Sequence, residues 1–243
     1  MHYTPTIPAL ILRSYRCFLD HGLTALLLAV APALVSGWVT ITVSPLHEDL
    51  AQIGLVLAVA LLQLIYILAL LRALQSKTRL YWPYRFWRDE LRAVLASFFF
   101  WFAFALPLWG LTPLLHYFGV DPLVGTVLLL VGVYAVALRM VLLLPLIVVE
   151  RKGVMDGIGE SWGKTKGLTL KLLVAAVVVV APWELVIRYA PQWFVVEQAS
   201  DMDIIVTVVQ SYLSTAVIGL FSYAVYDIQN AWAKRPEPGT TAS

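Results

Sequence analysis

The sequence predicts an all-α, polytopic integral membrane protein with six transmembrane helices, and its composition supports this first. Hydrophobic residues fill 60% of the 243 positions, charged residues fill only 13%, and the mean hydropathy is +0.82. Soluble globular domains contain roughly 45–50% apolar and about 25% charged residues. This chain has more apolar surface than one core can bury, which excludes a disordered chain and a soluble enzyme. Its single cysteine, Cys17, excludes an internal disulfide.

Six stretches are long and apolar enough to cross the hydrocarbon layer, because a spanning helix needs about 20 residues at about 1.5 Å each. A transmembrane barrel would instead show short segments of alternating polarity, which these stretches lack. They are Gly22–Val43, Ala51–Leu74, Ala93–Thr112, Thr126–Val149, Leu172–Ala190 and Ile204–Tyr226. Small residues before Pro32 resemble a signal-peptide cleavage site, but that proline and the long polar arm predict a retained helix.

The positions of the basic residues predict which way the helices run. All of the 17 lysines and arginines except Arg139 and Arg188 lie in or beside the N-terminal arm, the second and fourth connections, or the tail. The connections at 44–50, 113–121 and 191–203 contain acidic residues but no basic ones. By the positive-inside rule, both termini then face the cytoplasm. We expect the protein in a bacterial inner (cytoplasmic) membrane in this orientation.

Each odd-numbered span contains one proline, and the three prolines, Pro32, Pro107 and Pro182, are evenly spaced. This spacing predicts a single membrane domain over residues 1–230, made of three tandem helical hairpins, and a disordered cytoplasmic tail at 231–243. The hairpins cover about 10–75, 80–150 and 155–230. Any six-span protein with short loops would give a similar period. Each proline frees a carbonyl and bends its helix, which either opens a cleft or only improves packing.

An amphipathic segment precedes each odd-numbered span, at 11–22, 84–92 and 158–167, and we expect all three to lie along the inner membrane surface. Aromatic rings prefer the headgroup level, and each basic residue near an anionic leaflet contributes about 1 kcal/mol. Nucleic-acid binding would use the same residue types, but the neighbouring spans favour a membrane surface instead. The residues expected to contact anionic lipids are Trp82, Arg85, Trp87 and Arg88.

Three polar side chains, Gln63, Arg139 and Glu184, lie deep in predicted spans. Helical rise places Gln63 and Arg139 about 15–16 Å from the inner ends of their spans, and Glu184 about 18 Å from its own. Charged groups at such depth face a partner or a cavity. We therefore expect a buried Arg139–Glu184 ion pair to which Gln63 adds a hydrogen bond, with Arg188 as a weaker competitor for Glu184. Together these three side chains form a midplane polar layer. This layer either fixes helix register or forms a lipid-headgroup or proton-coupled site.

Motifs for catalysis and metal binding are missing from the sequence. There is no nucleophile elbow, no phosphate-binding glycine loop in a strand–turn–helix context and no zinc-protease helix motif. The candidate metal ligands of the predicted outer turns lack ligand spacing; they are His47, Glu48, Asp49, His116 and Asp121. We therefore expect no enzymatic activity, no bound metal and no cofactor.

A pattern between residues 139 and 172 resembles a bacterial membrane domain. An arginine within a span is followed by a proline, a glutamate at the inner end, and a Ser-Trp pair in a short surface helix: Arg139, Pro145, Glu150, Ser161 and Trp162. This resembles the membrane domain that precedes the catalytic barrel of membrane-anchored glycerophosphodiester phosphodiesterases, and stand-alone six-span bacterial relatives. The resemblance implies the membrane fold; the hydrolytic barrel is absent from this sequence, so it does not imply phosphodiesterase activity.

These observations predict a non-enzymatic inner-membrane protein that binds or passes lipid-like molecules, or supports envelope homeostasis. Two alternatives remain open at this point. One is a small transporter or channel that uses the midplane polar layer, and the other is a membrane interaction subunit or immunity-type protein. Expected partners are membrane lipids, anionic ones above all, and both a homo-oligomer and a membrane-protein partner are left open. No nucleic acid is expected.

Overall fold

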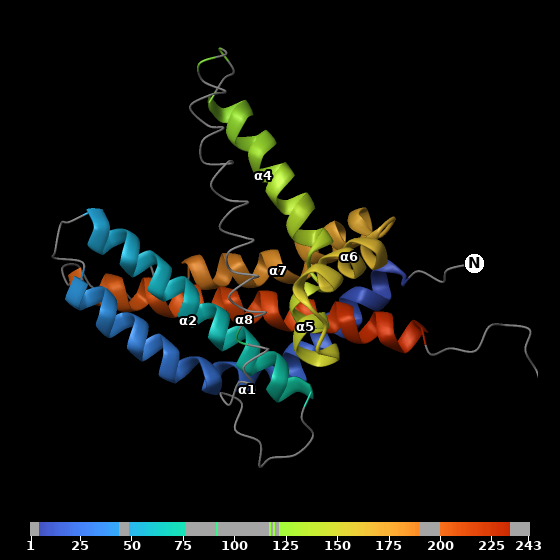
Figure 1. The fold of residues 1–243 in the computed structure, drawn as a ribbon, viewed down its shortest axis with the longest axis horizontal. Coiled ribbons are helices and arrows are strands. Elements are labelled where there is room, and N and C mark those ends of the chain that lie inside the picture. The colour runs from blue at the N-terminus through green and yellow to red at the C-terminus, as the bar shows by residue number, and fades with distance from the viewer. Residues whose placement is uncertain are drawn as a thin grey trace, which may run out of the picture. The chain divides into compact units, whose positions relative to one another are not determined.

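The computed structural model describes residues 5–43, 49–75, 91, 117, 119, 122–189 and 200–233. Its regular elements there are all α-helices, with no strand (Figure 1), so the predicted all-α class is confirmed. The helices are α1 (Ile7–Val43), α2 (Asp49–Gln75), α4 (Pro122–Arg139), α5 (Leu143–Glu150), α6 (Val154–Thr165), α7 (Thr169–Tyr189) and α8 (Ser200–Ala233). The predicted third span with Pro107, the lipid contacts Trp82, Arg85, Trp87 and Arg88, and the tail from 234 onward lie outside the described residues.

Five stretches of the described helices are long and apolar enough to cross a membrane: Ile7–Thr42, Gly54–Gln75, Val131–Glu150, Thr169–Ile187 and Ile204–Ala231. Large apolar side chains on these helices point outward. Leu19 is 84% exposed, Leu23 71% and Leu34 70%. Apolar surface of this extent is uncommon on soluble monomers and is suited to contact with lipid chains. The helices therefore indicate a membrane protein.

The first helix corrects one prediction. Residues 11–22 were expected to lie along the membrane surface, apart from the first span, but they belong to one continuous helix, α1, of 37 residues. At about 1.5 Å per residue this helix is about 55 Å long, which exceeds the roughly 30 Å hydrocarbon thickness. Pro8 lies in the first turn, where a proline is tolerated, and no further proline occurs before Pro32. Ser14 donates to the carbonyl of Leu10 (2.8 Å) within the helix. Amphipathic composition alone does not break a helix.

The fourth predicted span, Thr126–Val149, is interrupted by a turn. Helix α4 ends at Arg139 and α5 begins at Leu143, while Val131–Glu150 as a whole is long and apolar enough to cross a membrane. The cause is Pro145, the third residue of α5, because a proline has no N–H and its ring collides with the carbonyl four residues earlier. In the intervening turn the Leu143 N–H donates to the Met140 carbonyl, three residues back, at 2.9 Å.

The chain divides into two compact units, residues 1–58 with 170–243 and residues 59–169. This boundary falls inside the first predicted hairpin, so the three-hairpin organisation stays a prediction. In the first unit, α1 and α8 run antiparallel, as shown by the contacts Arg13–Asp227 and Ser36–Tyr212. Helix α7 runs parallel to α1, since the Tyr15 hydroxyl donates to the Val178 carbonyl (3.0 Å) and Phe18 stacks on Trp183.

The Tyr15 contact explains how the first unit accommodates Pro182. Proline cannot donate to the carbonyl four residues earlier, and in α7 that carbonyl belongs to Val178. The Tyr15 hydroxyl supplies the missing donor from α1. A neighbouring helix thus satisfies the group that the proline frees, which is how spanning helices tolerate proline.

Candidate functional site

Helices α4, α5 and α6 of the second unit bring together the five residues of the sequence pattern. We call this the α4–α5–α6 site; its residues are Arg139, Pro145, Glu150, Ser161 and Trp162. Its construction begins at the helix break. In an unbroken helix the Arg139 carbonyl would accept from the Leu143 N–H, but that N–H turns to Met140 instead. The Arg139 carbonyl therefore needs another donor.

Two hydroxyl groups of α6 supply that donor. The Ser161 Oγ donates to the Arg139 carbonyl at 2.7 Å, and the Thr165 Oγ1 lies 3.2 Å from the same oxygen. Both side chains are fully buried. The Thr165 hydroxyl has one proton and also lies 2.7 Å from the Ser161 carbonyl, so Ser161 is the principal donor. The helix break thus frees the Arg139 carbonyl, and the serine of the pattern, Ser161, supplies the donor that this carbonyl needs.

The side chain of Arg139 lies against Trp162. Its guanidinium carbon is 5.2 Å from the centre of the indole ring, and Nη1 donates to the Trp162 carbonyl at 3.4 Å. A cation over an indole face is favourable by about 0.5–1 kcal/mol at an exposed site, and Trp162 is 45% exposed. Within residues 122–169 no carboxylate forms an ion pair with Arg139. Its planar group of five N–H donors therefore retains capacity for an anion.

Apolar packing holds α6 on α5. Leu143 and Ile147 are buried in a cluster with Met140, and partly buried residues of α6 pack on it. Gly157 faces this cluster: a Cβ at that position would lie 3.1 Å from Leu143 Cδ1 and 3.6 Å from Ile147 Cγ1. The glycine therefore permits the close approach of the two helices.

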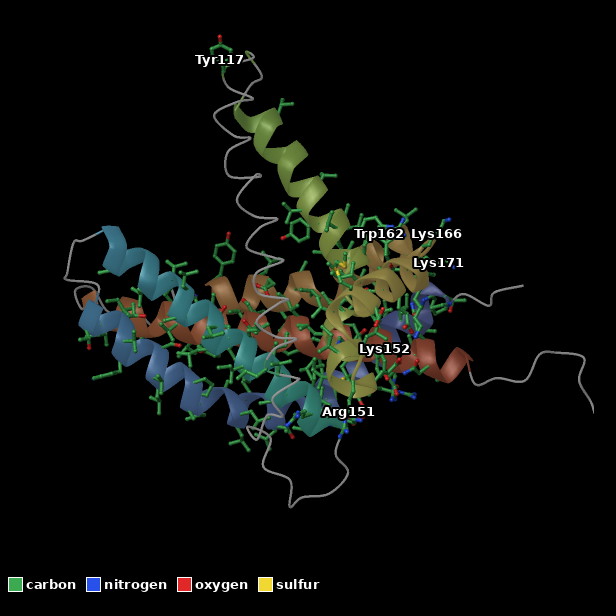
Figure 2. All side chains as sticks on the ribbon, viewed as in Figure 1. Tyr117, Arg151, Lys152, Trp162, Lys166 and Lys171 are labelled. Carbon is green, nitrogen blue, oxygen red and sulfur yellow. The ribbon has the colours of Figure 1, made fainter. Side chains whose placement is uncertain are left out.

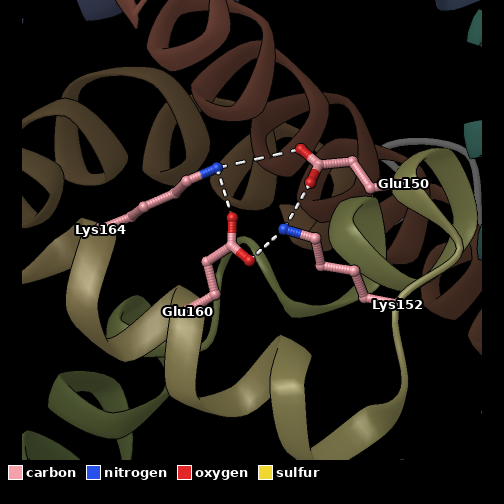
Figure 3. Close-up of polar contacts among 4 residues, drawn as sticks. All are labelled: Glu150, Lys152, Glu160 and Lys164. Atoms are coloured by element: carbon pink, nitrogen blue, oxygen red, sulfur yellow. Dashed lines mark hydrogen bonds and ion pairs between the residues drawn. The ribbon is translucent and has the colours of Figure 1, made fainter.

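A closed ring of four charges joins the end of α5 to α6 (Figure 3). Lys152 pairs with Glu150 at 2.8 Å and also with Glu160, while Lys164 pairs with Glu160 at 2.8 Å and with Glu150 at 3.9 Å. Arg151 adopts a left-handed conformation (φ 55°) that turns the chain between Glu150 and Lys152. Each isolated surface pair contributes little, but four alternating charges in one network hold a defined geometry.

The ring shifts two pKa values. Hydrogen bonds from Lys152 and Lys164 lower the pKa of Glu160 below 4.5, and hydrogen bonds to Glu150 and Glu160 raise the pKa of Lys152 from 10.5 to about 12. A carboxyl whose pKa is lower in the folded state stabilises folding above its unfolded value and loses that effect as the pH falls. For the lysine, the contribution is present below 10.5 and is lost as the pH rises through about 12.

Acid should therefore weaken the ring. We expect wild-type thermal stability to fall as the pH drops below 4.5, the unfolded pKa of Glu160, by an amount equivalent to about 1 kcal/mol or less, because the ring is partly exposed. Glu160→Gln should be less stable than wild type at neutral pH and show a flatter decline in acid. Circular dichroism melts at several pH values measure this, and parallel declines in both proteins would contradict it.

The first unit contains a second group of polar contacts that sequence reasoning found only in part. Ser214 Oγ donates to Glu184 Oε2 at 2.8 Å, and Gln210 Nε2 donates to the Ile187 carbonyl at 2.9 Å. Ser36 and Tyr212 share a hydrogen bond of 2.8 Å. The sequence signal for the α8 residues is the polar run at 210–215 inside a predicted span.

The predicted midplane layer is divided between the two units. Gln63 on α2 and Arg139 belong to the second unit, and Glu184 on α7 belongs to the first, so the Arg139–Glu184 pair stays a prediction. Pro32 and Pro182 lie inside α1 and α7, as expected. In the described part of the chain, no three His, Cys, Asp or Glu residues are grouped as metal ligands.

Comparisons with protein-family models, with curated proteins and with solved structures give no match to this chain. The resemblance to the membrane domain of glycerophosphodiester phosphodiesterases therefore stays an expectation. What defines the candidate site is its own geometry: an arginine on a half-exposed tryptophan, held in place by a helix break and a charge ring.

Proposed function

We propose that this protein is a non-enzymatic bacterial inner-membrane protein that binds or passes lipid-like molecules, with an anionic phospholipid headgroup held beside Arg139 and Trp162. The observation that carries the proposal is the Arg139 guanidinium resting on the half-exposed Trp162 ring, with no carboxylate partner within residues 122–169. In the proposed topology, with both termini cytoplasmic, the connection that carries Trp162 belongs to the cytoplasmic side of the membrane. Because Arg139 contacts Trp162, the proposal places Arg139 at this inner interface and not at the midplane depth predicted from the sequence.

The chemistry of the two side chains supports a phospholipid. A guanidinium matches the oxygens of a phosphate with two parallel N–H donors, which a lysine cannot do. An indole ring prefers the boundary between headgroups and acyl chains. The arginine thus suits the phosphate of a lipid, and the tryptophan suits the apolar region next to it.

Exposed basic residues flank the site at both ends. Figure 2 shows Trp162 and Lys166 together at one end of α6 and Arg151 with Lys152 at the other. Lys166 and Arg151 are both exposed. Each basic residue near an anionic leaflet contributes about 1 kcal/mol, so these residues would concentrate anionic lipid around Arg139.

The test is lipid retention by the purified protein. Wild-type protein extracted from membranes should carry phospholipid, identified by mass spectrometry, and Arg139→Ala should lose at least about tenfold of it, equivalent to about 1.4 kcal/mol. Arg139→Lys should retain an intermediate amount, because it keeps the charge but not the planar donor pair. Arg16→Ala is the matched control: Arg16 is an exposed arginine of α1, and its loss should leave retention near wild type.

Other outcomes would contradict the proposal. Equal lipid retention in Arg139→Ala and Arg16→Ala would show that the basic surface acts only through its total charge. Electrogenic flux in liposomes, without retained lipid, would favour a transporter. A stoichiometric protein partner, with neither lipid nor flux, would favour an interaction subunit.

A further inference from the structure

The first unit contains a carboxylate whose second oxygen has no partner in the described part of the chain. Glu184 lies in α7, two residues after Pro182, within a helix that is long and apolar enough to span a membrane. Its Oε2 accepts a hydrogen bond from Ser214 Oγ at 2.8 Å. Its Oε1 is buried and has no hydrogen-bond partner among the described residues.

We infer that Glu184 and Ser214 form a binding site for a small monovalent cation, a proton or a sodium ion, which neutralises the carboxylate inside the bundle. This site is independent of the lipid site proposed at Arg139. An ionised carboxylate that is buried without a compensating charge is strongly unfavourable, and such groups are neutralised or paired. The unpartnered Oε1 is the position where the neutralising cation would bind.

The ionisable groups on α1, α7 and α8 leave few protein partners for Glu184. No ionisable side chain occurs in α7 between Lys171 and Glu184, nor in α1 after His21. On α8, Tyr212 is the one ionisable residue within two turns of Ser214, and its hydroxyl is bonded to Ser36. Within the described residues of this unit, the imidazole of His21 forms no ion pair with Glu184, and Arg13 pairs with Asp227.

Two arginines compete as partners. Arg188 follows Glu184 by one helical turn, a spacing that permits an ion pair, and its side chain lies outside the described residues. Arg139 is the partner predicted from the sequence. If either paired with Glu184, the carboxylate would stay ionised and a cation would be excluded, so the test must separate these cases.

A hydrophobic carbodiimide distinguishes a neutralised carboxyl from an ion-paired one. The carboxyl proton moves to a carbodiimide nitrogen while the carboxyl oxygen adds to the central carbon; the adduct then rearranges to a stable N-acylurea without losing an atom. Only a protonated carboxyl reacts. We expect dicyclohexylcarbodiimide to modify the peptide containing Glu184 in sodium-free buffer, and Glu184→Gln to abolish that modification.

Sodium separates the two cations. If sodium is the natural occupant, added sodium should suppress the labelling at least tenfold relative to potassium. If the proton is the occupant, sodium should have no effect. Ser214→Ala removes a ligand oxygen for sodium, and it should therefore weaken protection by sodium while leaving the reaction itself intact. Suppression by sodium and the absence of a sodium effect both support the site: the first identifies sodium as the occupant and the second identifies the proton.

Labelling that is absent in wild type and emerges only in Arg188→Gln or Arg139→Gln would overturn the inference, because an arginine would then hold the carboxylate. If every variant stays unlabelled, the thermal stability of Glu184→Gln distinguishes a neutralised carboxyl from an ion-paired one. A glutamine side chain at this position imitates a neutralised carboxyl, so Glu184→Gln should then melt near wild type. A large drop in melting temperature would overturn the inference, since it would reveal a stranded arginine charge.

Discussion

Replacing Ser161 by alanine together with Thr165 by valine should destabilise the docking of α6 by roughly 2–3 kcal/mol. Both hydroxyls point to the Arg139 carbonyl, and removing them leaves a partly buried acceptor without these donors. An unsatisfied buried polar group costs about 1–3 kcal/mol. Ser161→Ala alone should account for most of this destabilisation, because the Ser161 hydroxyl lies closer to the Arg139 carbonyl than the Thr165 hydroxyl does.

Hydrogen exchange of the α6 backbone amides measures this effect, because it reports the free energy of local opening. Ser14→Ala is the matched control. Ser14 is also a fully buried serine, but its hydroxyl bonds the Leu10 carbonyl within α1, where the backbone hydrogen bond of the helix remains. Its replacement should change local stability by well under about 1 kcal/mol.

A double-mutant cycle with Pro145 tests the cause. In Pro145→Ala the ring collision is removed and α4 can continue into α5, so the Leu143 N–H can return to the Arg139 carbonyl. The hydroxyls should then be nearly dispensable, and their removal should cost less than about 1 kcal/mol. An equal cost in both backgrounds would show that Ser161 stabilises α6 for another reason.

The same site shows what the sequence could and could not predict. Arg139, Pro145 and Ser161 were selected as members of a pattern, and the structure joins them. Their physical link was missed because hydropathy averages over a window: the apolar run from 126 to 149 is unchanged by one proline, whereas the hydrogen-bond ladder is not. A proline interrupts the hydrogen-bond ladder in the turns before it, so a carbonyl there, here that of Arg139 six residues earlier, needs a donor from elsewhere. A buried Ser-Thr pair on a neighbouring helix is the signal.

Other misses have different causes. The surface segment at 11–22 was predicted from its aromatic, basic and partly apolar residues, but that composition occurs equally in a helix that continues into the membrane, as α1 does. The Glu184–Ser214 contact was missed because counting residues along a span gives depth and not direction. Two side chains at the same depth meet only if their helices turn the right faces to each other, and a single sequence does not specify those rotations.

Gly157→Leu should displace α6, with a destabilisation of about 3 kcal/mol. A Cβ at this position would already lie 3.1 Å from Leu143 Cδ1 and 3.6 Å from Ile147 Cγ1. Leucine adds three further carbons toward a cluster in which both neighbours are almost fully buried. Overfilling a packed core typically costs about 1–3 kcal/mol, and the short helix can relieve it only by moving away.

Gly159 provides the control on the same helix. A Cβ there would meet nothing within 4 Å, so Gly159→Leu should be neutral or stabilising by up to about 1 kcal/mol, since leucine favours helix more than glycine does. The stability of Gly157→Ala should lie between those of the two leucine variants. Alanine favours helix more than glycine does, and the flexible end of the Leu143 side chain can shift slightly to make room for the Cβ. Hydrogen exchange of α6 orders the three variants, and equal effects of leucine at 157 and 159 would contradict close packing at Gly157.

This pair of leucine variants also links packing to the proposed lipid site. Trp162 is carried by α6, whereas Arg139 ends α4, so the stacked pair exists only while α6 is docked. Gly157→Leu should therefore lose retained phospholipid as Arg139→Ala does, although it removes no charge. Gly159→Leu should retain it. A Gly157→Leu protein that exchanges rapidly at α6 yet keeps its lipid would show that binding needs the basic surface but not the Arg139–Trp162 geometry.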